Sequence, residues 1–368
     1  MKKVHIKDIC TKGSSALKQK DLLENGDYPV YGASGIAGYL NEYHQDKEYI
    51  AVVKDGSGIG RVSFQEPQSS VIGTMQYILP KEGYNIRYIG YCLQSLDLAG
   101  YKQGAAIPHI YFRDYGERLV NVTDDKAEQQ AIVSRLDSAF AKIDAVKANA
   151  EKQLNDAKAL FQKELSEAMM QKEWWEYSTL IEVFNFIDYR GATPYKLQSG
   201  VPLVTAKNVK FGYIDYAIKD YISREEFENR KGRGVSHKGD ILFTTEAPLG
   251  NVAIADLDEF SAGQRLITFQ QYRDSKFNVI NRFYYYYMLG PVFQEKIKSL
   301  ATGATAQGIK AKLLKTVTVP IPPLSEQQAI VTHLDTLSEK LKTVEEKQEA
   351  VMAECDAMKQ ALLREVFE

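Results

Sequence analysis

The segment Lys54-Asp-Gly-Ser-Gly-Ile-Gly60 contains the residues that most suggest cofactor chemistry, because it follows a strand-like run at Tyr49–Val53. A glycine-rich loop after a strand can bring its backbone close to a dinucleotide or to S-adenosylmethionine. The three glycines of such a loop, Gly56, Gly58 and Gly60, would then make the chain an enzyme, a methyltransferase. However, Arg61-Val-Ser-Phe64 alternates like a strand instead of beginning a helix. This pattern favours a tight β-turn.

The other residue types that carry out chemistry lack catalytic or metal-binding spacing. The sequence contains no GxxxxGK[ST] phosphate loop, no HExxH and no GxSxG. Its five histidines are not spaced as metal ligands. Cys10, Cys92 and Cys355 are odd in number, far apart and without a CxxC motif, so they predict neither a disulfide framework nor a zinc site. We therefore expect no catalytic residue, no metal and no cofactor in this chain.

Basic and polar residues in loops suggest a different chemistry, the binding of DNA. Lys and Arg neutralise phosphates, and Arg, Asn and Gln can make paired hydrogen bonds to base edges. A solvated surface is the alternative interpretation for each residue taken singly. The candidates are Lys54, Arg61, Lys102, Gln103, His109 and Arg113, and further along the chain Lys207, Asn208, Lys210, Arg230, Arg233, Lys238, Gln307, Lys310 and Lys312.

An internal repeat must position these residues. The eleven residues 127–137 recur at 325–335 with eight identities and a constant offset of 198. Upstream, Gly104–Ile110 aligns with Gly303–Ile309 at an offset of 199. Nearer the N-terminus the offset is smaller, which indicates loop insertions in the second copy. The sequence is therefore two homologous halves, each a variable domain followed by a more similar segment of roughly 45 residues.

The repeat also bears on the glycine-rich segment. Its counterpart, Thr244-Thr-Glu-Ala-Pro-Leu-Gly250, keeps only the last glycine. This further favours a β-turn over a cofactor loop. Both variable domains contain strand-like runs between Gly and Pro residues, so we expect mixed α and β structure. Within the second domain we favour a helix for Asn281–Leu289 and expect its tyrosines to lie in the core.

The two similar segments predict long helices. From Ile330 to Leu362 the second segment carries a heptad seam with alternating spacings of four and three residues, interrupted by the polar Gln348, which could fix the register. Subtracting 198 gives the seam of the first helix. We expect the two helices to pack on each other, the alternative being that each covers only its own domain. The predicted packing residues are Ile132, Leu136, Ile143, Val146 and Leu160, and Ile330, Leu334, Leu337, Leu341, Val344, Val351 and Met358.

The net charge of −2 argues at first against a nucleic-acid-binding protein. Divided by segment, however, residues 1–123 carry +1, 124–172 carry −1, 173–323 carry +3 and 324–368 carry −5. The acidity thus belongs to the predicted helices, and the variable domains are mildly basic. No apolar run approaches the roughly 20 residues of a membrane helix. We expect a cytoplasmic protein without a membrane partner.

Three stretches together resemble a known family. They are Val319–Val331 at the entry to the last helix, the degenerate copy Ala127–Val133, and the loop Gly303–Ile309. The sequence is similar to the specificity subunit of type I restriction-modification systems over nearly the whole chain. It departs from the pattern at Asn121–Lys126, which replaces the proline-rich entry in the first copy.

The resemblance implies an α+β fold with a pseudo-twofold internal repeat. Two homologous mixed α/β target recognition domains, residues 1–123 and 173–323, would be separated by spacer helices at 124–172 and 324–368, packed as an antiparallel coiled coil. Each domain would read one half of a split double-stranded DNA target, and the helices would set the gap. The subunit would be non-catalytic and would recruit two adenine-methylating modification subunits, which bind S-adenosylmethionine, and through them two ATP-dependent restriction subunits.

Two alternatives stay open. An interaction scaffold that binds proteins through its paired domains predicts no salt-dependent affinity for DNA. A methyltransferase predicts that the isolated chain binds S-adenosylmethionine.

Overall fold

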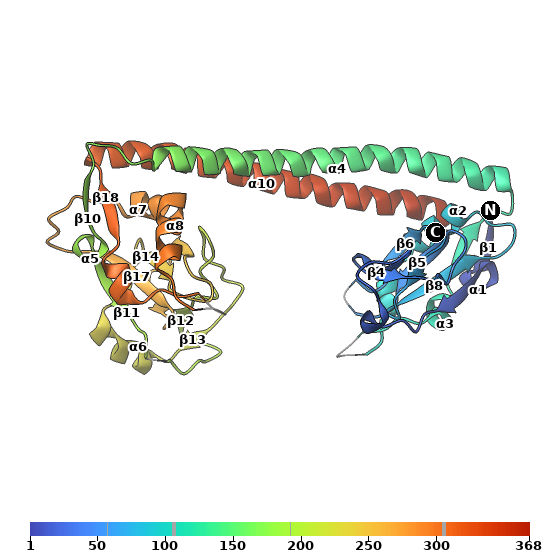
Figure 1. Cartoon of the computed structure of the whole chain (residues 1–368), viewed down its shortest axis with the longest axis horizontal. Coiled ribbons are helices and arrows are strands. Elements are labelled where there is room, and N and C mark those ends of the chain that lie inside the picture. Colours follow the sequence, from blue (N-terminus) through green and yellow to red (C-terminus); the bar gives the residue numbers. More distant parts are fainter. Residues whose placement is uncertain (57, 105–107, 192, 304–306) are drawn as a thin grey trace. The chain divides into compact units, whose positions relative to one another are not determined.

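The computed structural model of the chain describes residues 1–56, 58–104, 108–191, 193–303 and 307–368. It divides into two compact units. Unit 1 contains Met1–Gln153 and Lys347–Glu368, and unit 2 contains Leu154–Glu346. Each unit combines one mixed α/β domain with parts of two long helices, and both chain termini belong to unit 1 (Figure 1).

An antiparallel sheet in the order β2-β8-β5-β6 forms the centre of the unit 1 domain. Alternate residues of β5 point to opposite sides. Ile50 and Val52 join the core beneath α2, whereas Tyr49, Ala51 and Val53 join a second core. Because both faces of β5 are covered, all of its residues are buried. The sheet strands are β2 (Cys10–Ser14), β5 (Tyr49–Val53), β6 (Val62–Gln65) and β8 (Met75–Pro80).

Shorter elements complete unit 1. A small sheet has the order β4-β3-β7, and β1 pairs antiparallel with β9. Their bounds are β1 (Lys2–His5), β3 (Tyr28–Gly32), β4 (Gly35–Leu40), β7 (Ser70–Val71) and β9 (Leu119–Val122). The helices are α1 (Ile6–Ile9), η1 (Gln19–Asp21), α2 (Ile86–Ser95), η2 (Leu98–Tyr101) and α3 (Phe112–Tyr115).

Unit 2 repeats this arrangement. Its main sheet has the order β11-β17-β14-β15, its small sheet the order β13-β12-β16, and β10 pairs with β18 as β1 does with β9. The strands are β10 (Glu176–Thr179), β11 (Phe184–Asp188), β12 (Val201–Val204), β13 (Tyr221–Ile222), β14 (Ile241–Thr244), β15 (Val252–Ile254), β16 (Ser261–Ala262), β17 (Leu266–Gln271) and β18 (Thr318–Ile321). The helices are α5 (Leu180–Val183), α6 (Arg224–Arg230), η3 (Lys231–Arg233), α7 (Asn281–Leu289), α8 (Pro291–Leu300) and α9 (Ala311–Lys315).

Two sequence predictions about unit 2 are confirmed here. Residues Asn281–Leu289 form a helix, α7, and its tyrosines are buried in the main core of the unit. The second domain also carries an insertion, as predicted, but it includes a helix and not only loops, since α8 has ten residues where unit 1 has only the short η2.

The long helices are α4 (Lys126–Ala168) and α10 (Leu324–Phe367). In unit 1 the start of α4, at Val133 and Leu136, packs in one core with the end of α10, at Leu363 and Phe367. In unit 2 the end of α4 shares a core with the start of α10, where Leu165 meets the cluster containing Leu334. The helices are thus antiparallel, and the predicted fold class is confirmed. The assignment of 1–123, 124–172, 173–323 and 324–368 to recognition and spacing stays a prediction.

The predicted packing seam is right for most of α10, but in α4 it is wrong at Val146 and Leu160. Val146 and Leu160 are each 53% exposed, and Met358 in α10 is 50% exposed. Their places in the seam are taken by the next residues along, Lys147, Phe161 and Lys359, which are partly buried. The seam obtained for α4 by subtracting 198 from the positions in α10 is therefore one residue too early at Val146 and Leu160. The large side chains Phe140 and Phe161 lie on the face of α4 that is partly buried. Ile132, Leu136 and Ile143 are buried or partly buried as expected.

Polar pairs cross between the helices within each unit. In unit 1, Lys147 Nζ lies 2.6 Å from Asp356 Oδ1, and Lys359 Nζ lies 2.5 Å from Asp144 Oδ1. In unit 2, Lys158 Nζ lies 3.3 Å from Glu345 Oε1. None of the helices formed by the described residues is long and apolar enough to cross a membrane.

Candidate DNA-recognition loops

In unit 1, the loop after β5 and the loop before α3 lie against each other. The N–H of Ile110 donates to the carbonyl of Lys54 at 2.9 Å, and Asp55 forms an antiparallel bridge with His109. The Asp55 carboxylate lies 2.6 Å from His109 Nδ1 and 3.2 Å from Lys54 Nζ. Two of the predicted residues, Lys54 and His109, therefore meet at an aspartate that the sequence analysis did not single out.

The same loop pair, here called loop pair 1 (residues 54–56 with 103–104 and 108–113), includes two more candidates. Gln103 pairs with His109 through both backbone hydrogen bonds at 2.8 Å, and its side-chain amide donates to Asp114 at 2.9 Å. The Arg113 guanidinium lies 4.6 Å from the centre of the exposed Tyr111 ring. Loop pair 1 thus presents a cation, an amide, an imidazole and an aromatic face, which are the groups that contact phosphates and bases.

Lys102 is exposed next to loop pair 1. Arg61 lies apart from it, in the turn before β6, where Nη1 donates to the carbonyl of Ala33 at 2.7 Å. The glycines of this turn have positive φ of 83° at Gly56, 87° at Gly58 and 83° at Gly60. A Cβ at Gly60 would lie 2.6 Å from the backbone nitrogen of Ala99. The glycines therefore serve a tight turn that leads into β6, as predicted, and not the start of a helix.

Unit 2 contains the equivalent loop pair 2 (residues 244–246 with 302–303 and 307–312). The N–H of Ile309 donates to the carbonyl of Thr245 at 3.0 Å, and Glu246 bridges Gly308 as Asp55 bridges His109. The Glu246 carboxylate lies 3.1 Å from Arg265 Nε. The same backbone framework thus holds an acid in both units but pairs it with a different cation.

The predicted DNA-binding residues of loop pair 2 lie next to the bridge between Glu246 and Gly308. Gln307, Lys310 and Lys312 are exposed. Lys312 is the second residue of α9, as Arg113 is the second residue of α3. The two cations occupy equivalent positions of the repeat. Of the glycine-rich loops predicted from the sequence, Ser57, Ala105–Ile107 and Ala304–Ala306 lie outside the described residues.

Two predicted DNA-binding residues prove to be structural. Asn208 is 2% exposed, and its side chain accepts from Thr205 N and Oγ1 and donates to the carbonyls of Asp215 and Ile218. Arg230 is 5% exposed, and it donates to Ser261 Oγ and to the carbonyl of Ala262 while stacking 4.3 Å from the Tyr189 ring centre. Burial commits both side chains to holding loops, so the prediction that they contact DNA is wrong.

The remaining candidates of unit 2 are spread around the domain. Lys207 lies beside loop pair 2, in the lining of a cavity of about 190 Å³ together with Gln264 and Arg265. Lys210 lies 3.9 Å from Asp215, and Lys238 lies 3.2 Å from Asp258. Arg233 Nη1 donates to the carbonyl of Arg190 at 2.9 Å.

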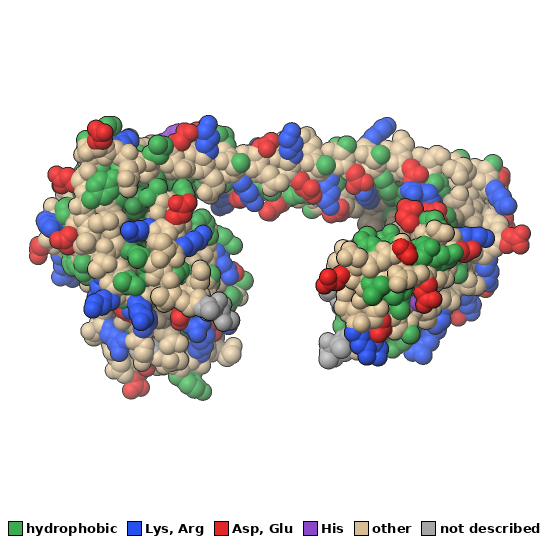
Figure 2. Space-filling model, viewed as in Figure 1, with side chains coloured by type: hydrophobic (Ala, Val, Ile, Leu, Met, Phe, Trp, Pro, Cys, Tyr) green, Lys and Arg blue, Asp and Glu red, His purple; other side chains and the backbone are tan. Residues whose placement is uncertain are grey.

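Sequence reasoning missed Asp55, Tyr111, Glu246, Gln264 and Arg265. The signal for Asp55 and Glu246 was their shared place just after a buried strand in both halves of the repeat. On the face drawn in Figure 2, basic and acidic side chains are intermixed over each unit. Among the described residues, no cluster of three or more His, Cys, Asp or Glu could hold a metal ion.

Two homologous α/β domains, each with a polar loop pair and each attached to an antiparallel pair of helices, make up a duplicated architecture. A family model described as type I restriction modification DNA specificity domain matches residues 1–156 and 172–352. The chain belongs to this family of type I restriction-modification specificity subunits. The two matched segments correspond to the two halves of the internal repeat.

Individual relatives agree with this family. The type I restriction enzyme MjaVIII specificity subunit of Methanocaldococcus jannaschii is 22% identical over 380 residues, which is 94% of this chain and 87% of that protein. The MjaIX specificity subunit of the same organism is 32% identical over 167 residues, which is 42% of this chain but 35% of that protein. A chain from a structure of complex assembly in the type I R-M system shares the fold, with a TM-score of 0.69 and 16% identity over 99% of this chain and 97% of that chain.

Proposed function

We propose that this chain is the non-catalytic DNA-recognition subunit of a type I restriction-modification complex. Each α/β domain reads one half of a split target in double-stranded DNA, and the helix pair sets the gap between the halves. The chain recruits two adenine-methylating subunits, which bind S-adenosylmethionine, and two ATP-dependent restriction subunits. No cofactor is bound by the chain itself.

The observation that carries this proposal is the pairing of a repeated framework with different side chains. Loop pairs 1 and 2 have the same backbone bridges, but one carries Asp55 with His109 and the other Glu246 with Arg265. A duplicated fold with diverged loops suits a target whose two halves differ, because the pseudo-twofold repeat matches the local dyad of DNA. The long helices suit a spacer, since 43 and 44 residues at 1.5 Å each give ~65 Å.

The test is to co-express the chain with its modification subunit and to map methylated adenines across the genome. We expect a split motif. Exchanging residues 1–123 for those of a relative should change one half only, and lengthening both helices by one heptad should change the gap only. An unsplit motif, or a swap that alters both halves, would refute the proposal.

The same preparation tests the alternatives. Phosphate contacts predict that log K falls linearly with log salt concentration, whereas a protein-binding scaffold predicts a slope near zero. Binding of S-adenosylmethionine by the isolated chain would favour the methyltransferase. Its glycine turn leads into a strand, which argues against that alternative.

A further inference from the structure

In unit 1 one aspartate of a long helix receives two side chains of the recognition domain. The hydroxyl of Tyr91 and Nη2 of Arg87 both donate to Oδ1 of Asp137, the second at 2.9 Å. Arg87 and Tyr91 are four residues apart on α2 and therefore lie on the same face of that helix. Phe140, one turn beyond Asp137 on α4, packs edge-to-face against the Tyr91 ring at 5.4 Å.

Unit 2 contains the same contact. Nε of Arg282 donates to Oδ1 of Asp335 at 2.7 Å, and the hydroxyl of Tyr286 donates to the same oxygen at 2.6 Å. Arg282 and Tyr286 are again four residues apart, on α7. Asp335 stands 198 residues after Asp137, at the last position of the repeated eleven-residue motif. A side-chain contact between helix and domain thus explains why this position is identical in both copies.

A second contact lies eight residues earlier in each helix. Gln129 and Gln327 are both fully buried. The side-chain oxygen Oε1 of Gln129 accepts from the N–H of Asn85 at 2.7 Å, and its side-chain Nε2 donates to the carbonyl of Thr123 at 2.9 Å. Gln327 accepts from the N–H of Ile280 at 2.9 Å and donates to the carbonyl of Pro322 at 2.9 Å. The glutamine holds the beginning of the helix, and the aspartate holds it two turns on.

Two contacts fix the direction of a helix, whereas one contact leaves a pivot. Eight residues separate the glutamine from the aspartate, which is ~12 Å along the axis. If the helix pivots at the glutamine and the aspartate, ~12 Å along, shifts by ~1 Å, the far end of the helix, about 31 residues and ~47 Å beyond the aspartate, shifts by ~5 Å. One base-pair step of DNA is ~3.4 Å. The displacement that the aspartate contact prevents is therefore large enough to change the gap by one base pair.

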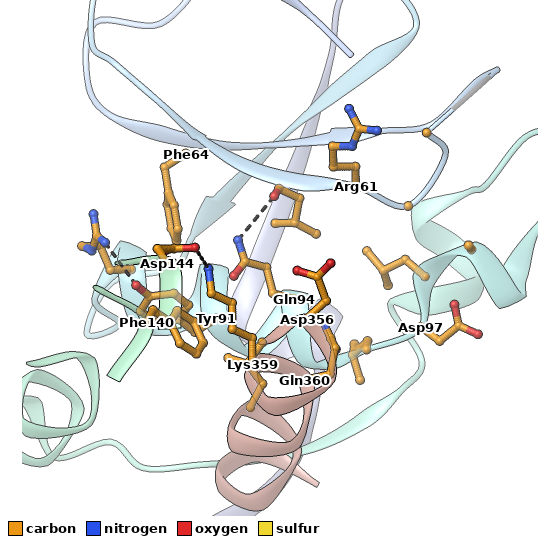
Figure 3. A pocket seen from close by; sticks show the side chains of 18 of the residues that line it. Arg61, Phe64, Tyr91, Gln94, Asp97, Phe140, Asp144, Asp356, Lys359 and Gln360 are labelled. Carbon is orange, nitrogen blue, oxygen red and sulfur yellow. Dashed lines mark hydrogen bonds and ion pairs between the residues drawn. The ribbon is translucent and has the colours of Figure 1, made fainter. Parts of the chain in front are cut away.

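The surroundings of the unit 1 contact leave room for such a movement. A groove of about 1090 Å³ runs between β6 and α2 on one side and α4 and α10 on the other (Figure 3). Arg87, Tyr91 and Asp137 are among its lining residues. The helix is also held by the buried side chain of Leu136 and by the contact of Phe140 with Tyr91, and the hydrogen bonds to the carboxylate add a directional constraint on the groove side.

We propose that Asp137 and Asp335 are positioning residues that fix the direction of each long helix against its recognition domain and so restrict the complex to one gap length. This inference rests on the proposed function. Neither residue touches DNA in this role, since each acts through the helix that carries it.

The experiment uses the complex of the chain with its modification subunits. The target and its gap are first taken from the methylation map of the wild type. Methylation rates are then measured on duplexes with the native gap and with one base pair added or removed. For Asp335→Asn and Tyr286→Phe we expect the ratio of native to shifted rates to fall about tenfold, the factor of one charged hydrogen bond. Glu339→Gln, exposed one turn further along α10, is the matched control and should keep the wild-type ratio.

Tyr286→Phe removes one hydroxyl and leaves the ion pair in place, so it remains informative if Asp335→Asn folds poorly. Equal losses on native and shifted duplexes would leave the ratio unchanged and would reduce the aspartate to a purely structural contact, which overturns the inference. A ratio that falls equally in Glu339→Gln would overturn it as well. An unsplit wild-type motif would instead refute the proposed function itself, and the map shows this before any variant is made.

Discussion

At the scale of single residues, Arg230 holds the small sheet of unit 2 in place. Its guanidinium donates to Ser261 and Ala262 on β16 and is stacked on Tyr189. Arg230→Met should lower the free energy of unfolding by about 2–4 kcal/mol, because buried acceptors lose charged donors. Chemical denaturation of the purified chain measures this. Arg233→Met, at an exposed neighbouring position, is the control and should change stability by less than about 0.5 kcal/mol. Equal effects of the two substitutions would contradict the structural role of Arg230.

Substitutions of Arg113 and Lys312 should change the salt dependence of DNA binding. Both are exposed at the second residue of a short helix in equivalent loops. As phosphate contacts, each should contribute about one unit to the salt slope of the assembled complex. Arg113→Ala and Lys312→Ala should therefore each weaken binding on every sequence alike and make the slope shallower by about one. Lys298→Ala, on the exposed side of α8, should leave the slope unchanged. Unaltered slopes in the first two variants would remove these residues from the interface.

Glu182 predicts a pH dependence of stability. The hydroxyl of Ser178 and the N–H and hydroxyl of Thr179 hold the Glu182 carboxylate and lower its pKa from 4.5 to about 2. A lowered folded-state pKa stabilises the fold above the unfolded pKa, and this contribution is lost as the pH falls from about 4.5 towards 2. Glu182→Gln should therefore flatten the acid side of the stability profile in that window and leave its shape above pH 6 unchanged. Parallel wild-type and variant profiles between pH 2 and 5 would contradict the assignment.

At the scale of elements, the sequence allowed the long helices, the duplicated domains and the helix at the tyrosine run to be predicted. Each depends on periodicity or on the repeat. The register of α4 was not predictable by transfer from α10, since Phe140 and Phe161 pack where the second helix has Ser338 and Lys359. The burial of Asn208 and Arg230 could not be predicted from the sequence either. Their residue types suit DNA, but the hydrogen bonds that hold them come from residues such as Ser261 and Ile218, distant or unremarkable in the sequence.

We expect Gln348 to fix the register of the two long helices. Its amide donates to Gln153 at 2.9 Å within unit 1, a polar contact between the two helices. Polar seam residues specify register at a cost in stability. Gln348→Leu should therefore keep or raise the melting temperature of the chain while lowering the preference of the complex for one gap length. Lys347→Leu, an exposed neighbour, is the control. If Gln348→Leu raises stability and leaves both complex assembly and target spacing unchanged, the register role is wrong.

At the scale of the whole molecule, the weak positive charge of the domains sets the expected affinity. Residues 1–123 and 173–323 carry +1 and +3, while the two helical segments are acidic. Phosphate neutralisation supplies most of the non-specific affinity for DNA. The isolated chain should therefore bind DNA at least tenfold more weakly than its complex with the modification subunits at the same salt concentration. Equal affinities in a titration of both preparations would show that the partners contribute nothing to phosphate neutralisation.

The distribution of cysteine and tryptophan gives each unit its own reporter. All three cysteines, at 10, 92 and 355, belong to unit 1 and are buried, and burial raises the pKa of Cys10 to about 12. Both tryptophans, Trp174 and Trp175, belong to unit 2 and share the Glu326 carboxylate there. Thiol labelling therefore times the opening of unit 1, and indole fluorescence follows unit 2. The wild-type chain can thus show, without engineered probes, whether its two halves unfold together or in turn.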